Sequence, residues 1–258
     1  MADSVVYLYA VTDAAPAEVH GEEPALAGVD GVPVRRVVSG DLAAVVSSVD
    51  PTRFSEEALR RSLEDLQWLE RTARAHNAVV TAVARSGPIA PVRLATVYLD
   101  DENVRALLDE RAAEFSSALD RIRGRAEWGV KGFAVRSKGE GDASLQVTEE
   151  PKPGTAYLMR RRTERDRAAR GLQDAAEAAE AVHREMSACA VASRRYQPQD
   201  PRLSGRREEM VLNVAYLVDE AGADALRRLV EQHDGQSLRL ELTGPWAPYS
   251  FATLEEEP

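Results

Sequence analysis

The nine residues from Met210 to Val218, MVLNVAYLV, limit more than any other stretch how this chain can fold. The run is almost continuously apolar, which is typical of a β-strand that is buried on both faces. We therefore expect a sheet with cover on both sides, and the segments around this strand must supply its neighbours.

Helix and strand signals alternate around this strand. Trp128 to Val135 predicts a strand, Ala223 to His233 a short helix, and Leu238 to Leu242 a half-buried strand. A long helix is predicted from about Thr155 to Tyr196, where the few large apolar residues are separated by alanines. The order β, long α, β, α, β, with one strand unrecognised, is that of a modified ferredoxin-like α+β sandwich.

The first half of the chain has a different order of elements. Val5 to Val11 predicts a strand, and the runs 34–38 and 42–49 predict a hairpin around Ser39-Gly40-Asp41. Ser55 begins a predicted long helix that ends before Gly87-Pro88. One apolar stripe on this helix comprises Leu59, Leu63, Leu66, Leu69, Ala73, His76, Val80 and Val83. A strand at 92–99 and a helix at 103–123 complete this half.

The length of 258 residues exceeds that of one typical domain. We therefore predict an α+β protein of two domains, an N-terminal domain at 1–125 and a C-terminal ferredoxin-like domain at 126–258. Within the second domain, residues 138–154 are polar and residues 197–209 contain proline and arginine, so both are predicted to be loops.

Charge and cysteine content exclude several classes of protein. A formal net charge of -10 opposes general binding to nucleic acid, because the phosphate backbone would be repelled. The single Cys189 excludes an internal disulfide and fits a reducing compartment. The N-terminus lacks the positive region of a signal peptide, and no apolar run reaches the roughly 20 residues that span a bilayer. We expect a cytoplasmic protein without a membrane partner.

The common catalytic and metal-binding spacings are absent from the sequence, so no catalytic, cofactor-binding or metal-ligating residue is nominated. His76 is the notable titratable residue, because it falls on the apolar stripe of the first long helix. It is either a half-buried histidine that is hydrogen-bonded to a neighbouring strand or a general base, and the first interpretation is favoured.

Six arginines stand together near the start of the second long helix: Arg160, Arg161, Arg162, Arg165, Arg167 and Arg170. Glu164 and Asp166 interrupt them at helical spacing, which favours a solvated, partly self-paired face. A site for an anion or an acidic protein is the alternative. The helix itself either packs on its own sheet or binds a partner.

The ten residues 242–251, LTGPWAPYSF, gather aromatic residues that are rare elsewhere in the chain. Gly244-Pro245 can turn the backbone and Pro248 stiffens it, so Trp246, Tyr249 and Phe251 project from an extended segment. We expect these rings to close the last strand onto the body of the protein, and a role in binding is the alternative. Trp246→Ala or Phe251→Ala should then cost roughly 3 to 5 kcal/mol.

These ten residues also resemble the C-terminal signature Leu-Thr-Gly-Pro-Trp-Pro-Pro-Tyr-Ser-Phe of gas vesicle synthesis proteins of the GvpF/GvpL type. VYLYAV at 6–11, His76, PVRLATVYLDDENV at 91–104, EWGVKGF at 127–133 and GTAYL at 154–158 resemble the same family in the same order. The chain departs from the family at Leu94 and Ala95, where Arg-Phe-Gly-Thr is usual.

The resemblance implies an accessory protein of gas vesicle formation and not an enzyme, located at the gas vesicle and in the cytoplasm. Its implied partners are the small hydrophobic major shell protein, whose aggregation it would prevent, and other accessory proteins. A scaffold that never meets the shell protein is the alternative, followed by a small-molecule enzyme or sensor. Five residues are expected to be structural or to contact partners: Arg93, His76, Trp246, Tyr249 and Phe251.

Overall fold

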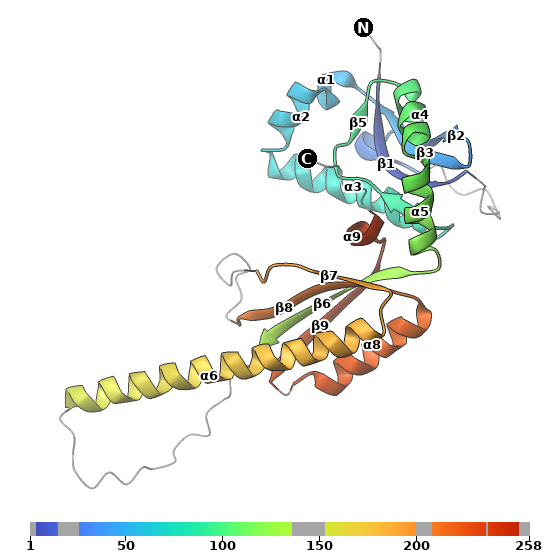
Figure 1. Ribbon diagram of the computed structural model, residues 1–258. Coiled ribbons are helices and arrows are strands. Elements are labelled where there is room, and N and C mark those ends of the chain that lie inside the picture. The colour runs from blue at the N-terminus through green and yellow to red at the C-terminus, as the bar shows by residue number, and fades with distance from the viewer. Residues whose placement is uncertain (1–3, 15–25, 136–152, 200–207, 236, 253–258) are drawn as a thin grey trace. The chain divides into compact units, whose positions relative to one another are not determined.

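The computed structural model describes residues 4–14, 26–135, 153–199, 208–235 and 237–252 (Figure 1). The chain divides into two compact units, one formed by residues 1–127 and 245–258 and the other by residues 128–244. Of the two predicted loops, residues 138–152 and 200–207 lie outside the described residues.

The first unit is built on an antiparallel sheet (Figure 1). Its strand order is β2-β3-β1-β4, and β5 also pairs with β1. The predicted hairpin is confirmed, with Gly40 at a φ of 54° between its two strands. The strands are β1 (Val5–Asp13), β2 (Arg35–Ser39), β3 (Leu42–Val49), β4 (Ile89–Pro91) and β5 (Val97–Tyr98).

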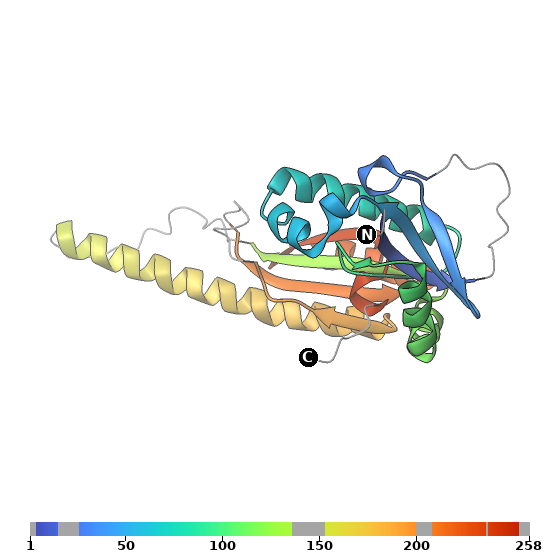
Figure 2. The ribbon, with the colours of Figure 1, turned by 90° about the horizontal axis from the view of Figure 1, so that it is seen from above.

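Helices cover this sheet on both faces, with α1 to α3 on one side and α4 and α5 on the other (Figure 2). The buried pattern of β1 is nearly continuous, as expected for a central strand with both faces covered. The helices are α1 (Pro51–Phe54), α2 (Glu56–Ser62), α3 (Leu66–Ala84), α4 (Asp101–Glu110), α5 (Ala112–Ile122) and α9 (Tyr249–Ala252), with a short 3₁₀ helix η1 at Val29–Gly31.

The predicted helix from Ser55 to Gly87 is broken in the structure. It ends at Ser62 and begins again at Leu66, because the Asp65 side chain accepts hydrogen bonds from the backbone N–H groups of Gln67 and Trp68. The break turns two members of the predicted apolar stripe outward. Leu63 is 46% exposed and Leu66 is 78% exposed, so their predicted burial is wrong.

The predicted strand 92–99 is also interrupted. A turn at residues 93–96 separates β4 from β5, and Ala95 lies in this turn at a φ of 64°. This turn was not predicted, because alanine seldom takes the left-handed conformation. In the predicted helix 103–123, Arg111 leaves helical geometry and separates α4 from α5.

The described residues of the second unit form six elements in the order β-α-β-β-α-β. They are β6 (Ala126–Ala134), α6 (Pro153–Ala188), β7 (Ala192–Arg195), β8 (Met210–Val218), α8 (Glu220–His233) and β9 (Leu238–Trp246). The sheet order is β7-β8-β6-β9, with β8 inside the sheet as its sequence predicted. Residues 214–218 of β8 are buried, whereas Val211 and Asn213 are half-buried.

Strand β7 is the element that the sequence left unrecognised. The predicted helix 155–196 stops at Ala188, and residues 192–195 pair antiparallel with β8. The strand is short and its arginines are exposed, so it has no apolar alternation that would reveal it. The element order and the sheet order support a ferredoxin-like sandwich, which stays a prediction.

The C-terminal segment, residues 245–252, lies with a different part of the chain than the predicted domain division expected. The sequence assigned it to the second domain, but in the structure it belongs to the first unit. Helix α9 packs against α5 and β4. A contact between segments more than 100 residues apart leaves no local pattern in the sequence, which is why this assignment differs from the prediction.

Candidate functional site

A cluster of buried polar rings lies in the first unit between β1 and α3. Tyr7 and Tyr9 are two residues apart on β1, so both side chains point to the same face of the sheet. His76 on α3 faces them, with its ring centroid 5.8 Å from that of Tyr7 and 5.5 Å from that of Tyr9. Only 3% of His76 is exposed, so this histidine is fully buried and not half-buried as the sequence predicted.

Hydrogen bonds fix the two tyrosines of this cluster. The Tyr7 hydroxyl accepts from the backbone N–H of Ala95 at 3.0 Å and lies 3.0 Å from Nδ1 of His76. The Tyr9 hydroxyl accepts from the backbone N–H of Val29 at 2.8 Å and donates to Oγ of Ser47 at 3.0 Å. The cluster therefore ties β1 to β3, η1, α3 and the turn before β5.

Burial keeps the cluster uncharged. It lowers the pKa of His76 to about 4 and raises the pKa of Tyr7. The backbone of Val92 opposes the shift of His76, but Nε2 has no hydrogen-bond partner among the described residues. A neutral, enclosed imidazole of such low pKa is a weak base at neutral pH, which argues against general-base chemistry.

The C-terminal segment adds one ring to this cluster. Tyr249 packs against the same core, with its ring centroid 6.5 Å from that of His76, and burial raises its pKa to about 12. Glu127 holds the neighbouring residue, because its carboxylate accepts hydrogen bonds from the N–H of Ser250 at 2.8 Å and from Oγ of Ser250 at 2.6 Å. The segment is fixed through Tyr249 and Ser250.

The other predicted site residues do not join the cluster. Trp246 is 52% exposed, so the prediction of a core ring at this position is wrong, and Phe251 is half-buried in the first unit. Arg93 is exposed on the turn, where its carbonyl accepts from Oγ1 of Thr96 at 2.8 Å. The structure thus brings together His76 and Tyr249.

The two tyrosines of the cluster were not predicted as site residues. Tyr7 and Tyr9 were assigned to a strand, although a buried tyrosine hydroxyl needs a polar partner and so indicates a polar site inside the core. The same signal applies to Tyr216 on β8 of the second unit. Its hydroxyl lies 2.7 Å from Nδ1 of His183 on α6, and burial lowers the pKa of His183.

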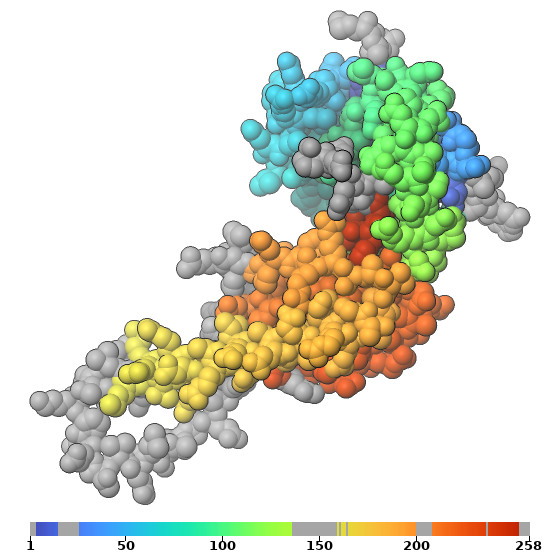
Figure 3. Space-filling model, in the orientation of Figure 1, coloured from blue at the N-terminus to red at the C-terminus, as the bar shows by residue number. Residues whose placement is uncertain are grey.

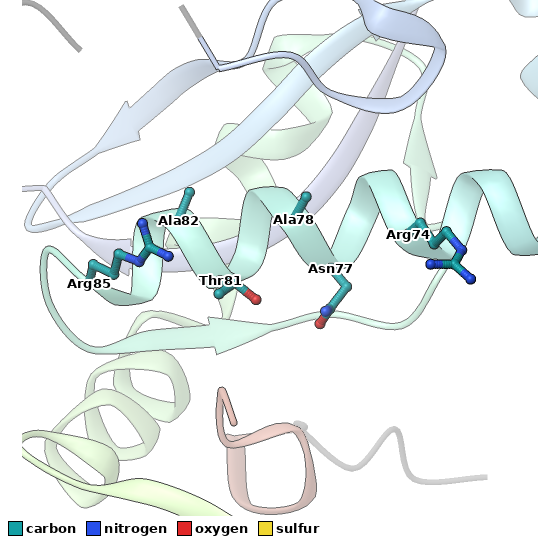
Figure 4. A pocket seen from close by; sticks show the side chains of 6 residues that line it. All are labelled: Arg74, Asn77, Ala78, Thr81, Ala82 and Arg85. Carbon is teal, nitrogen blue, oxygen red and sulfur yellow. The ribbon is translucent and has the colours of Figure 1, made fainter. Parts of the chain in front are cut away.

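An open groove of about 500 Å³ runs along the outer face of α3 (Figure 4). Polar and small side chains line it: Arg74, Asn77, Ala78, Thr81, Ala82 and Arg85. Neither His76 nor Arg93 belongs to its lining, so the groove is separate from the residues that an enzyme or sensor was expected to use.

Candidate metal clusters and candidate membrane-spanning helices are both absent from the residues that the structure describes. They contain no group of three or more histidine, cysteine, aspartate or glutamate side chains placed to hold a metal ion. In the same part of the chain, each helix is too short or too polar to cross a membrane.

Comparison with known proteins relates the whole chain to gas vesicle proteins. The family model described as Gas vesicle synthesis protein GvpL/GvpF matches residues 5–253. Gas vesicle protein L of Streptomyces sp. (strain CB03234) is 42% identical over 99% of this chain and 95% of its own length. Gas vesicle protein F of the same strain is 28% identical over 85% of this chain and 87% of its own length.

Two crystal structures share the fold. GvpF from Anabaena sp. PCC7120 matches with a TM-score of 0.64 and 22% identity over 99% of this chain and 98% of that chain. GvpF from Microcystis aeruginosa matches with a TM-score of 0.61 and 18% identity over 97% of this chain and 99% of that chain. Together with the match to the family model along nearly its entire length, these similarities show that the chain belongs to the GvpL/GvpF family of gas vesicle synthesis proteins.

Proposed function

We propose that this protein binds the small, hydrophobic major shell protein of the gas vesicle and prevents its aggregation during nucleation and assembly. Membership of the GvpL/GvpF family, which implies an accessory role in gas vesicle formation, is the observation that supports this most. A shell subunit with one strongly apolar surface would aggregate before reaching a growing vesicle, so a partner must cover that surface. The protein then acts in the cytoplasm and at the vesicle, with other accessory proteins as further partners.

The corner between α2 and α3 offers an apolar contact for such a partner. Leu63 and Leu66 are exposed there, three residues apart, with Asp65 between them as the cap of α3. Among the residues predicted for partner contact, the ring of Trp246 is half exposed and Arg93 is exposed. We assign His76 and Tyr249 a structural role, because both pack in the core of the first unit.

The polar groups of the first unit support a role without catalysis. The Tyr7–His76 pair is buried and neutral at physiological pH, and the groove on α3 lies apart from it. An enzyme would need a titratable group that meets substrate in a concave site. The neutral, enclosed pair favours a binding protein over an enzyme or sensor.

Co-expression with the shell protein tests the proposal. The wild-type protein should raise the soluble fraction of the shell protein and co-purify with it. The double variant L63D/L66D should lose both effects with only a small change in melting temperature, because Leu66 is 78% exposed and Leu63 is 46% exposed. Leu99→Asp is the matched control, since Leu99 is 70% exposed elsewhere in the first unit.

Two results would contradict the proposal. If the wild type neither solubilises nor captures the shell protein, direct binding is wrong. If crosslinking in assembling cells then joins this protein only to other accessory proteins, it is a scaffold. Loss of binding in Leu99→Asp alone would move the contact away from the α2–α3 corner.

A further inference from the structure

Helix α6 has two halves with different environments. From residue 171 onward it packs in the second unit, with Ala175, Ala179, Val182 and Met186 buried. Its N-terminal half, residues 153–170, we call the arm. Each side chain described between residues 159 and 170 is exposed, and the arm projects past the strands of its own unit (Figures 1 and 3).

The arm is strongly basic in an otherwise acidic protein. Its sequence contains six arginines against one glutamate and one aspartate, a net charge of +4. The whole chain has a formal charge of -10, so the remainder has a charge of -14. The carboxylates of the packed half, such as Glu180 and Glu185, face Arg195 and His233 instead.

Several of these arginines are spaced as like-charge neighbours on one face of the helix. Arg161 and Arg165 are four residues apart, and Arg162 and Arg165 are three apart, which places like charges next to each other on one face. Few apolar side chains compensate, since Met159 is 64% exposed and Ala168 and Ala169 are small. Two acidic residues cannot balance six arginines, so a partner that supplies negative charge would stabilise this part of the helix.

Several arginines on other helices form ion pairs within their own helix. Within α2, α3 and α8, respectively, Arg60 pairs with Glu56, Arg74 with Glu70 and Arg227 with Asp224. In contrast, Arg162, Arg165 and Arg167 form no ion pair with any carboxylate that the structure describes, and Arg170 donates to the backbone carbonyl of Asp166. At these positions of the arm, the partial self-pairing expected from the sequence is not seen with the described carboxylates.

We propose that the arm is a docking surface for an acidic segment of another protein. The planar guanidinium group binds carboxylates through two parallel hydrogen bonds, and arginine rather than lysine occupies each basic position of the arm. A short acidic segment can bind along the arm without reaching the acidic remainder of the chain. A nucleic acid duplex would extend beyond it and bring phosphates against the acidic remainder of the chain.

A second copy of this chain fits the arm less well. In a symmetric dimer around the arm, each basic surface would face its own copy, and the like charges would repel. An arm that docked on a different face of the next copy would produce a ring or an open-ended filament of molecules. Neither arrangement neutralises the positive charge of the arm as simply as a separate acidic segment does.

Binding of a synthetic glutamate-rich peptide to the full chain tests this proposal. The peptide should bind the wild type, and its glutamine counterpart should not. The double variant R162E/R165E should bind at least about tenfold more weakly, since it replaces two attractive contacts by repulsive ones. Affinity should also fall as salt is raised from about 0.05 to 0.5 M, because the contacts are exposed. Arg228→Glu is the matched control, an exposed arginine on α8 of the same unit, and should bind like the wild type.

Circular dichroism of R162E/R165E should match that of the wild type, so that lost binding is not lost structure. The neutral variant R162Q/R165Q, with an intermediate affinity, gives a second measure. Equal binding by wild type and R162E/R165E, equal loss in Arg228→Glu, or equal binding of the glutamine peptide would overturn the proposal. So would arm-dependent binding of duplex DNA without peptide binding, or arm-dependent self-association in sedimentation velocity.

Discussion

Ala95 has a backbone conformation that suits glycine better than any residue with a β-carbon. Its φ of 64° lies in the left-handed region, and its N–H donates to the hydroxyl of Tyr7 at 3.0 Å, so the conformation is held by the buried cluster. The residue before Thr96 is usually glycine in the Arg-Phe-Gly-Thr pattern that the chain otherwise resembles. This chain therefore keeps a turn whose strain a glycine would remove.

We expect Ala95→Gly to raise the free energy of unfolding by about 1 kcal/mol, because relief of the left-handed strain outweighs the added flexibility of the unfolded chain. Urea unfolding followed by circular dichroism measures the change. Ala78→Gly is the control, since Ala78 is an exposed residue inside α3 and its replacement should cost about 1 kcal/mol. If both variants lose stability, Ala95 is not strained.

His76 should make the first unit sensitive to acid. Burial lowers its pKa from 6.5 to about 4 in the folded protein, so the unfolded chain binds more protons between these values. The contribution of neutral His76 to the free energy of unfolding is complete above pH 6.5. It is lost progressively as the pH falls to 4, by about 3 kcal/mol in total. Unfolding measured from pH 7 to 4 should show this slope, and His76→Gln should flatten it.

A second measurement covers the case in which His76→Gln does not fold. In proton NMR of the wild type, the ring signals of His76 should stay constant down to about pH 5. Titration of exposed side chains nearby cannot produce this result, because it would change a ring signal with pH and would not keep it constant. Titration of His76 near pH 6.5 would show that the ring is hydrated and that the Tyr7–His76 contact is open.

Two aromatic residues of the C-terminal segment, Tyr249 and Trp246, differ in how much they contribute to the free energy of unfolding. Tyr249 packs on the core beside His76, whereas half of Trp246 is in water. Tyr249→Ala should therefore lower the free energy of unfolding by about 2 kcal/mol, and Trp246→Ala by less than about 1 kcal/mol. Thermal unfolding compares the two. A larger loss in Trp246→Ala would restore the core position that the sequence predicted for its ring.

Local patterns predicted the elements that have such patterns. The hairpin 34–49 has a glycine turn between two apolar runs, β8 is a continuous apolar run, and α8 has both periodicity and a glycine stop, so each was found. The break at Asp65 was missed because a capping aspartate inside a periodic stretch looks like any exposed polar residue. Strand β7 was missed because its identity depends on pairing with β8.

The candidate site could be predicted only in part for the same reason. The apolar stripe placed His76 inward, but nothing local relates it to Tyr7, 69 residues earlier, or to Tyr249 at the other end of the chain. Trp246 was expected in the core as part of an aromatic segment that closes the last strand, but as the last residue of β9 it is 52% exposed. Long-range packing decides these positions, and a single sequence records it weakly.

The first unit is made of two separate stretches of the chain, residues 1–127 and 245–258. Deletion of residues 245–258 should therefore weaken the first unit, since it removes Tyr249 from the core and leaves Glu127 without Ser250. Hydrogen exchange followed by mass spectrometry should show lost protection in α3, α5 and β4, while peptides from β8 and α8 keep theirs. Lost protection confined to the second unit would assign the segment to that unit, as the sequence had suggested.

The interrupted first unit has a consequence for synthesis of the protein. A chain leaves the ribosome from its N-terminus, and domains generally fold in the order in which they emerge. Here residues 1–127 emerge first but must wait for residues 245–252, while residues 128–244 form a continuous unit and can complete their sheet earlier. Until translation reaches Tyr249, the edge of the aromatic core beside His76 stays uncovered. The part of the protein that is made first is thus finished last.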